Sequence, residues 1–139
     1  MAQAQKQASC EDRIEAALDS ERETFRTYMN DHEVYEEGND ELPAFNEYGL
    51  SFGYIAAGTF EGQDTGFYCY QLSFGGPSDE LRFHRDGSVE YRFHDWFDGA
   101  GRTVTNEDWV QWLVEMFRDC EMIDWNAAAD KDREAIHGY

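Results

Sequence analysis

Two pairs of side chains in the middle of the chain have the chemistry for catalysis. His94 and Asp95 combine an imidazole with a carboxylate, the groups of general acid–base catalysis, and Cys69 with His84 offers a thiol nucleophile and a base. However, His94 and Asp95 point to opposite faces of any strand that holds both. We therefore expect His94 to be a structural or surface histidine and Cys69 to be a small residue packed in a sheet. A small enzyme with a site near His94, using Asp95 or Glu90, stays as an alternative.

Metal and phosphate sites have weaker support. The carboxylates between residues 31 and 41 offer oxygen ligands, but they lack the alternating spacing and the closing glutamate of a calcium-binding loop. Gly75 and Gly76 precede a proline and a strand-like sequence, where a phosphate-binding loop requires the start of a helix. The sequence therefore predicts no metal and no cofactor.

The acidic residues near the N-terminus have a regular spacing. Glu11, Glu15, Asp19 and Glu23 recur every fourth residue, so a helix places them in one row with about 6 Å between neighbours. Successive phosphates along one nucleic-acid strand have a similar repeat of about 6 to 7 Å. We predict that this acidic row imitates a nucleic-acid backbone and binds a partner. The same prediction covers an acidic run that follows, which consists of Glu33, Glu36, Glu37, Asp40 and Glu41.

The net charge agrees with this hypothesis. Thirty Asp and Glu residues stand against eleven Lys and Arg residues, for a formal net charge of −19, and the acidic residues are spread along the chain from residue 10 onward. Nineteen charges correspond to about 32 Å of duplex DNA, at one charge per roughly 1.7 Å. Such a surface repels nucleic acid and membranes and attracts basic proteins. Solvated helix faces without a partner, or a salt-adapted host, are the alternative explanations.

Helical periodicity defines the ends of the domain. It predicts a helix from Ser9, as N-cap, to about Asn30, followed by a loop with at most one short helical turn. A second helix is expected after an N-cap at Thr105, because an apolar stripe follows it. The stripe consists of Trp109, Trp112, Leu113, Met116 and Phe117. A short third helix is expected after Asn126, and its anchors are Trp125 and Ile136.

The middle of the chain is predicted to be β structure, with strands at 50–60, 67–74, 79–85 and 88–95. For the last hairpin we expect a type I turn with a bulge at Gly87, which pairs His84 with Ser88. This register puts Phe83 opposite Val89, so that the sheet has one apolar face and one polar, ion-paired face.

These elements predict an α+β fold, an antiparallel β-meander of about four strands with one N-terminal and one C-terminal helix packed on one face. Residues 9–139 are expected to form a single acidic domain and residues 1–8 a disordered N-terminus. No apolar stretch has the length of a membrane span or the position of a signal peptide, and the cysteines lack paired spacing. A cytoplasmic location is therefore expected.

The stretch from Gly66 to Gly99 contains YQLSFGGPSDELRF followed by DWFDG. This pattern, YQLSxGGPSxExRF and then DWFDG, resembles small acidic proteins of unassigned function from bacterial plasmids and phages, over about a quarter of the chain. The resemblance implies a mobile genetic element, where small acidic proteins often disarm host nucleases. Within DWFDG, we expect Trp96 and Phe97 to pack in the core at a strand end, with contact to a partner as the alternative.

The sequence therefore predicts a DNA mimic, an inhibitory protein of anti-CRISPR or anti-restriction type that is not an enzyme. Its expected partner is a basic nucleic-acid-binding protein or nuclease complex, and direct binding to nucleic acid or membrane is not expected. A monomer and a homodimer are both compatible with the sequence. An immunity protein or antitoxin against a basic nuclease toxin is the alternative binding function.

Overall fold

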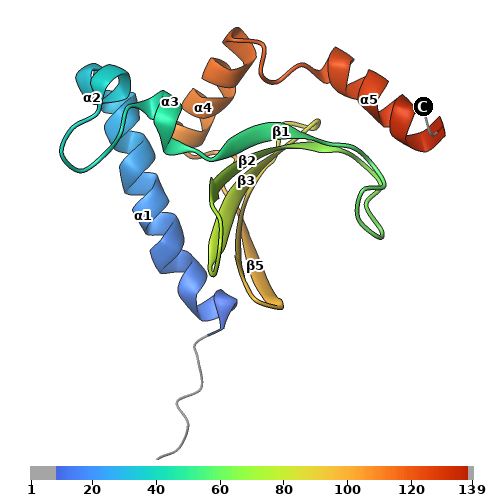
Figure 1. The fold of residues 1–139 in the computed structure, drawn as a ribbon, viewed down its shortest axis with the longest axis horizontal. Helices are drawn as coiled ribbons and strands as arrows, with labels where there is room; N and C mark the ends of the chain where they lie inside the picture. The colour runs from blue at the N-terminus through green and yellow to red at the C-terminus, as the bar shows by residue number, and fades with distance from the viewer. Residues whose placement is uncertain (1–8, 138–139) are drawn as a thin grey trace, which may run out of the picture.

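The computed structural model describes residues 9–137, so the expectation of a disordered segment at residues 1–8 lies outside the described residues. The helices are α1 (Cys10–Asn30), α2 (His32–Glu37), α3 (Phe45–Tyr48), α4 (Asp108–Asp119) and α5 (Trp125–His137). The strands are β1 (Ser51–Ile55), β2 (Phe67–Ser73), β3 (Ser78–His84), β4 (Val89–Asp95) and β5 (Asp98–Thr103). This arrangement confirms the α+β class (Figure 1).

The sheet is an antiparallel meander in the order β1-β2-β3-β4-β5, so the expected number of about four strands is one too few. The missed strand, β5, has the sequence DGAGRT, whose glycines lower strand propensity. A Cβ atom at Gly99 would lie 2.9 Å from Nδ1 of His94, and one at Gly101 would lie 3.0 Å from Oε2 of Glu90. Side chains of β4 therefore lie across β5, and the glycines make room for them.

The predicted register of the β3–β4 hairpin is confirmed. Phe83 pairs with Val89, and the amide of His84 donates to the carbonyl of Ser88 at 2.9 Å. Gly87 has φ 93°, a left-handed conformation that glycine adopts without strain. The alternation of apolar and polar residues along both strands thus fixes which face is buried.

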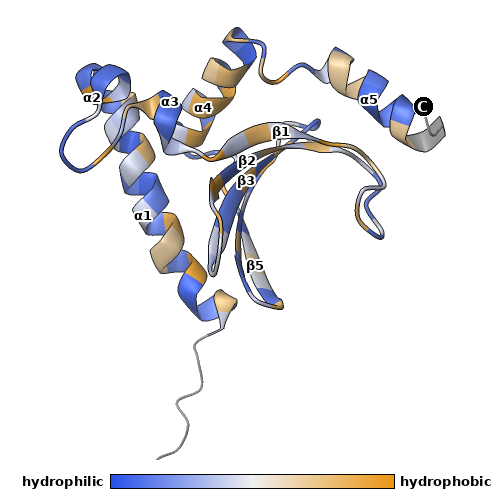
Figure 2. Cartoon of the chain, viewed as in Figure 1, coloured by the Kyte–Doolittle hydropathy of each residue, from blue (hydrophilic) through white to orange (hydrophobic). Residues whose placement is uncertain are grey.

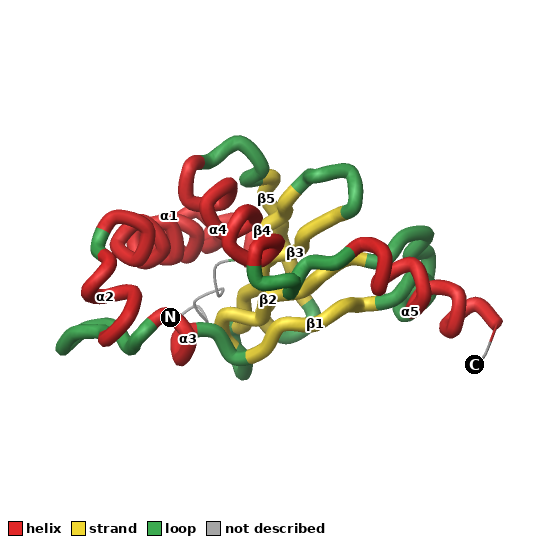
Figure 3. Tube along the Cα trace, turned by 90° about the horizontal axis from the view of Figure 1, so that it is seen from above, coloured by secondary structure: helices red, strands yellow, loops and turns green. Residues whose placement is uncertain are grey.

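Helices α1 and α4 pack on the same face of the curved sheet, and Figure 3 shows them together on one side of the strands. Ser9 caps α1 as predicted, since its hydroxyl accepts the amide of Asp12 at 3.2 Å. Phe25 of α1 stacks on Trp109 of α4, with ring centroids 5.5 Å apart. The fully buried Leu113 continues the apolar stripe of α4, so one aromatic core joins both helices to the sheet.

The predicted N-cap of the second helix is wrong. Helix α4 begins at Asp108 after Glu107, and no side chain within residues 9–137 makes a capping hydrogen bond there. The hydroxyl of Thr105 instead accepts the amide of Val89 at 3.0 Å. Thr105 therefore satisfies the first amide of β4, which a sequence pattern for helix capping does not reveal.

Two other expectations concern helix α5 and the DWFDG segment. Helix α5 is present and Trp125 packs on Tyr68 with centroids 5.1 Å apart, whereas the side chain of Ile136 lies outside the described part of the chain. The expectation that DWFDG packs in the core is wrong, because Trp96 is 86% exposed and Phe97 fully exposed. Both residues form the two-residue turn between β4 and β5.

Two carboxyl groups lie between α1 and the sheet, one of them buried and the other half-buried. Asp79 is buried and accepts hydrogen bonds from the hydroxyls of Ser73 and Tyr91, the latter at 2.7 Å. Glu21 accepts the hydroxyl of Tyr48 at 2.7 Å. Burial, and then the negative charge of Asp79, raise the pKa of Glu21 from 4.5 to about 8, although the Tyr48 hydrogen bond opposes this. The raised pKa of Glu21 therefore favours its protonated form in the folded protein at neutral pH.

Replacing Trp109 by alanine is expected to lower the free energy of unfolding by about 3 to 5 kcal/mol, because it empties the space between α1 and α4. The matched control is Trp96→Ala, which removes the same side chain from an 86% exposed site and should change stability by less than about 0.5 kcal/mol. Urea unfolding followed by circular dichroism measures both. Equal losses in the two variants would contradict the placement of these tryptophans.

The raised pKa of Glu21 predicts a pH dependence of stability. Its pKa is raised in the folded state, so between about pH 5 and pH 8 the folded protein holds a proton that the unfolded chain has lost. The free energy of unfolding should therefore fall with rising pH, by up to about 1.4 kcal/mol per pH unit from this group. Glu21→Gln should flatten the fall, whereas Glu23→Gln, at an exposed position of the same helix, should keep it. Identical slopes for both variants would refute the raised pKa.

Candidate protein-binding surface

Helix α1 presents the predicted acidic row on its exposed side, but most of the row is paired. Arg102 of β5 binds Glu11 and Glu15, each at 2.7 Å. Arg22, about one helical turn after Asp19 in α1, binds the carboxylate of Asp19. Only Glu23, the fourth carboxylate of the row, has no ion pair among residues 9–137. Two arginines thus compensate the row in part, and Arg22 is shared with Glu107, so the row gives a weaker negative field than its spacing suggests.

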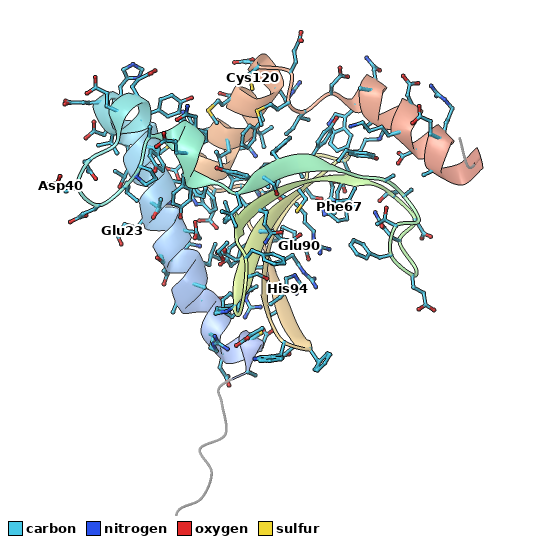
Figure 4. All side chains as sticks on the ribbon, viewed as in Figure 1. Glu23, Asp40, Phe67, Glu90, His94 and Cys120 are labelled. Carbon is cyan, nitrogen blue, oxygen red and sulfur yellow. The ribbon has the colours of Figure 1, made fainter. Side chains whose placement is uncertain are left out.

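The acidic run on α2 and the loop after it is different. All five of its carboxylates are exposed, and within residues 9–137 their one ion pair joins Glu36 to His32 at 3.7 Å. The sequence has no lysine or arginine between Arg26 and Arg82, so no cation lies nearby along the chain. In Figure 2, α2 is coloured mainly as hydrophilic, and in Figure 4 Asp40 points away from the fold. The acidic run is therefore the main uncompensated negative surface.

Local sequence holds this run in a defined shape. The Asp31 carboxylate caps α2 by accepting the amide of Val34 at 3.2 Å, and Val34 is buried. Gly38 has φ 76°, and a Cβ there would lie 2.7 Å from the backbone nitrogen of Ala44. The side chain of Asn39 accepts two backbone amides of the loop at 2.8 Å. The carboxylates thus stand on an ordered turn and not on a flexible tail.

An aromatic cluster fixes α2 to the rest of the domain. The ring of Tyr35 stacks on Phe45 of α3 with centroids 5.0 Å apart, and Phe45 meets Trp112 of α4 at 5.6 Å. The Tyr35 hydroxyl also donates to the sulfur of Met116 at 3.2 Å. The acidic run therefore has a fixed position relative to α4.

Sequence reasoning missed three carboxylates near this surface. Glu115 and Asp119 on α4 and Glu121 in the turn after it are all exposed and have no ion pair among the residues that the structure describes. The apolar stripe of α4 dominates its pattern, but the spacing of Glu115 and Asp119, four residues apart, was a signal that they share a helix face.

The alternative site near His94 lies on the open, concave face of the sheet. As predicted, His94 and Asp95 point to opposite faces, and Asp95 binds Arg13 of α1 at 2.6 Å. His94 lies 3.7 Å from Oε1 of Glu80, and burial lowers the pKa of its imidazole. A cavity of about 310 Å³ adjoins it, lined in part by Trp96 and by backbone of the β2–β3 turn. Figure 4 shows His94 and Glu90 on this face.

The thiol on the same face is held protonated. Cys69 donates to Oε2 of Glu80 at 3.2 Å, and burial, with the charge of Glu80, raises the pKa of the thiol to about 12. His84, its suggested base, instead packs against Phe67 with ring centroids 5.6 Å apart, and its Nε2 lies 4.0 Å from Oε1 of Glu90. Cys69 and His84 therefore do not form the suggested thiol–imidazole pair. The carboxylate of Glu80 instead lies beside both Cys69 and His94.

Two further properties concern metal ions and membranes. Among residues 9–137, no three His, Cys, Asp or Glu side chains form a group that could hold a metal ion. None of the described helices combines the length and hydropathy needed to cross a membrane.

Comparison with known proteins leaves the residues themselves as the basis for assigning a function. The chain matches no protein-family model, and no curated protein or solved structure is significantly similar to it.

Proposed function

We propose that the chain is an inhibitory binding protein that imitates nucleic acid and blocks a basic nuclease complex of a host defence system, of anti-CRISPR or anti-restriction type. The observation that supports this proposal best is the acidic run, an ordered surface of exposed carboxylates with no arginine or lysine partner within residues 9–137. A groove that binds phosphates is lined by lysine and arginine, and such carboxylates compete for the same cations.

The acidic run replaces the row on α1 as the main contact of this proposal. Within the row, Glu11, Glu15 and Asp19 would have to exchange their arginine partners for those of the target, which reduces the gain on binding. Glu23 and the acidic run need no such exchange. Electrostatic attraction of this kind accelerates association and weakens as salt screens the charges.

Neutralising the acidic run tests the proposal. The variant replaces Glu33, Glu37, Asp40 and Glu41 by Gln or Asn, and it should raise the concentration for half-inhibition of DNA cleavage by about tenfold or more, since it removes the charges that bind the groove. The probes are a CRISPR effector and a restriction enzyme, each assayed on duplex DNA between about 50 and 200 mM salt. Inhibition by the unmodified protein should weaken across this range.

A charge-matched control separates this surface from net charge. It replaces four other exposed carboxylates, Asp12, Glu61, Asp64 and Glu134, by Gln or Asn. Inhibition by this control should change less than about threefold, because the contacting surface is intact. Equal losses in both variants would mean that only net charge matters. Inhibition that is indifferent to salt would remove the mimicry mechanism.

A further inference from the structure

An apolar cavity opens beside the acidic run. It has a volume of about 410 Å³, and its walls come from α2, α3, β1, β2, α4 and the turn after α4. The apolar side chains that line it include Tyr35, Phe45, Leu50, Met116, Phe117 and Met122. Leu50 is 60% exposed and Met122 40% exposed, although both are large apolar residues. Folding of the described residues therefore leaves an apolar site open to solvent.

The apolar site continues along α4, beside Glu115 and Asp119. Met116 and Cys120 line both the cavity and a neighbouring depression of about 420 Å³, which Trp112, Glu115 and Asp119 complete. Trp112, Met116 and Cys120 are each four residues apart and form an apolar row along α4. Glu115 and Asp119 form a second, acidic row beside it. The two depressions together, which we name the apolar groove, thus have an apolar floor and an acidic border.

We infer that the apolar groove binds a basic amphipathic helix of the protein partner. The two rows of α4 repeat every four residues, or about 6 Å, which is also the spacing of i and i+4 side chains on an approaching helix. Apolar side chains of that helix fill the groove, and its lysines or arginines meet Glu115 and Asp119. Unbranched methionine side chains at the floor adapt to different apolar shapes. This inference rests on the proposed function, because it names the element of the basic partner that the surface holds.

Charge separates this occupant from the others. A second copy of the chain would bring another surface of exposed carboxylates against the acidic run, and like charges repel. A small neutral molecule would fill the cavity but leave the acidic border without a partner. Only a ligand that combines apolar side chains with positive charge uses both parts of the groove.

Two synthetic peptides of identical composition test the inference. One arranges leucine and lysine as an amphipathic helix, and the other scrambles the same residues so that leucine is spread around the helix. Fluorescence anisotropy should give about tenfold tighter binding of the amphipathic peptide, since only this peptide presents an apolar stripe. Equal affinities, or no binding of either peptide, would overturn the inference.

Matched variants locate the site. Leu50→Asn with Met122→Asn alters two exposed apolar residues of the groove and should abolish the preference for the amphipathic peptide. Phe74→Asn with Phe97→Asn alters two exposed apolar residues outside the groove and should keep it. Loss of the preference in the second pair, or its survival in the first, would place binding elsewhere.

Alkylation of Cys120 supplies a readout that does not depend on mutation. Cys120 is exposed, whereas burial raises the pKa of the Cys10 thiol and raises that of Cys69 to about 12, so a maleimide at neutral pH should label Cys120 selectively. The amphipathic peptide should slow this labelling at least about fivefold. Protection of Cys120 without peptide that rises with protein concentration would show a second copy in the groove and overturn the inference.

The two proposals fail in different assays. Peptide selectivity without inhibition of DNA cleavage would leave the groove assignment standing and refute the nuclease target. Inhibition that survives Leu50→Asn with Met122→Asn, together with equal binding of both peptides, would refute the groove and leave the acidic run as the inhibitory surface.

Discussion

The five strands bury only one of their two faces, and the other features of the molecule depend on this asymmetry. Helices α1 and α4 cover the face that carries Leu81, Phe83 and Tyr91, and the stacking of Phe25 on Trp109 joins the two helices over it. The uncovered face has to be polar, and it holds ion pairs within single strands, between Arg82 and Glu80 and between Arg92 and Glu90. The glycines of β5 give the long side chains of β4 room to lie flat on this face.

The same asymmetry explains where negative charge stays free. Four of the nine arginines join separate elements of the fold: Arg13 joins α1 to β4, Arg22 and Arg26 join α1 to the start of α4, and Arg102 joins β5 to α1. Each of these bonds compensates a carboxylate of α1 or of an element that contacts it. Helix α2, the loop after it and the end of α4 form no ion pair with these arginines, and among residues 9–137 their carboxylates have one ion pair, between Glu36 and His32. Structural use of these cations thus leaves the carboxylates of this region without an arginine partner.

Sequence patterns predicted the parts of the fold that local periodicity determines. The cap and length of α1, the apolar stripe of α4 and the register of the β3–β4 hairpin follow from residues close together in the chain, and the structure has all three. Strand β5 escaped prediction because the need for its glycines arises from His94 and Glu90 on the neighbouring strand. The pairing of the acidic row also escaped, since Arg102 meets Glu11 and Glu15 only after the chain has folded. The groove was hidden for a similar reason, because its walls come from elements far apart in the chain.

The acidic run and the apolar groove share one structural support, the aromatic cluster of Tyr35, Phe45 and Trp112. Repulsion among exposed carboxylates lowers stability, and aromatic packing beneath them offsets this cost by about 0.5 to 1.5 kcal/mol per ring pair beyond the area that it buries. The aromatic cluster also leaves part of the apolar groove uncovered, since Leu50 and Met122 are exposed to solvent. A positively charged partner with an apolar stripe would relieve both unfavourable features in one contact, by neutralising the carboxylates and covering the apolar edge. Local stability and affinity for such a partner are therefore opposed in this region, because each carboxylate that strengthens binding also strains the unbound fold.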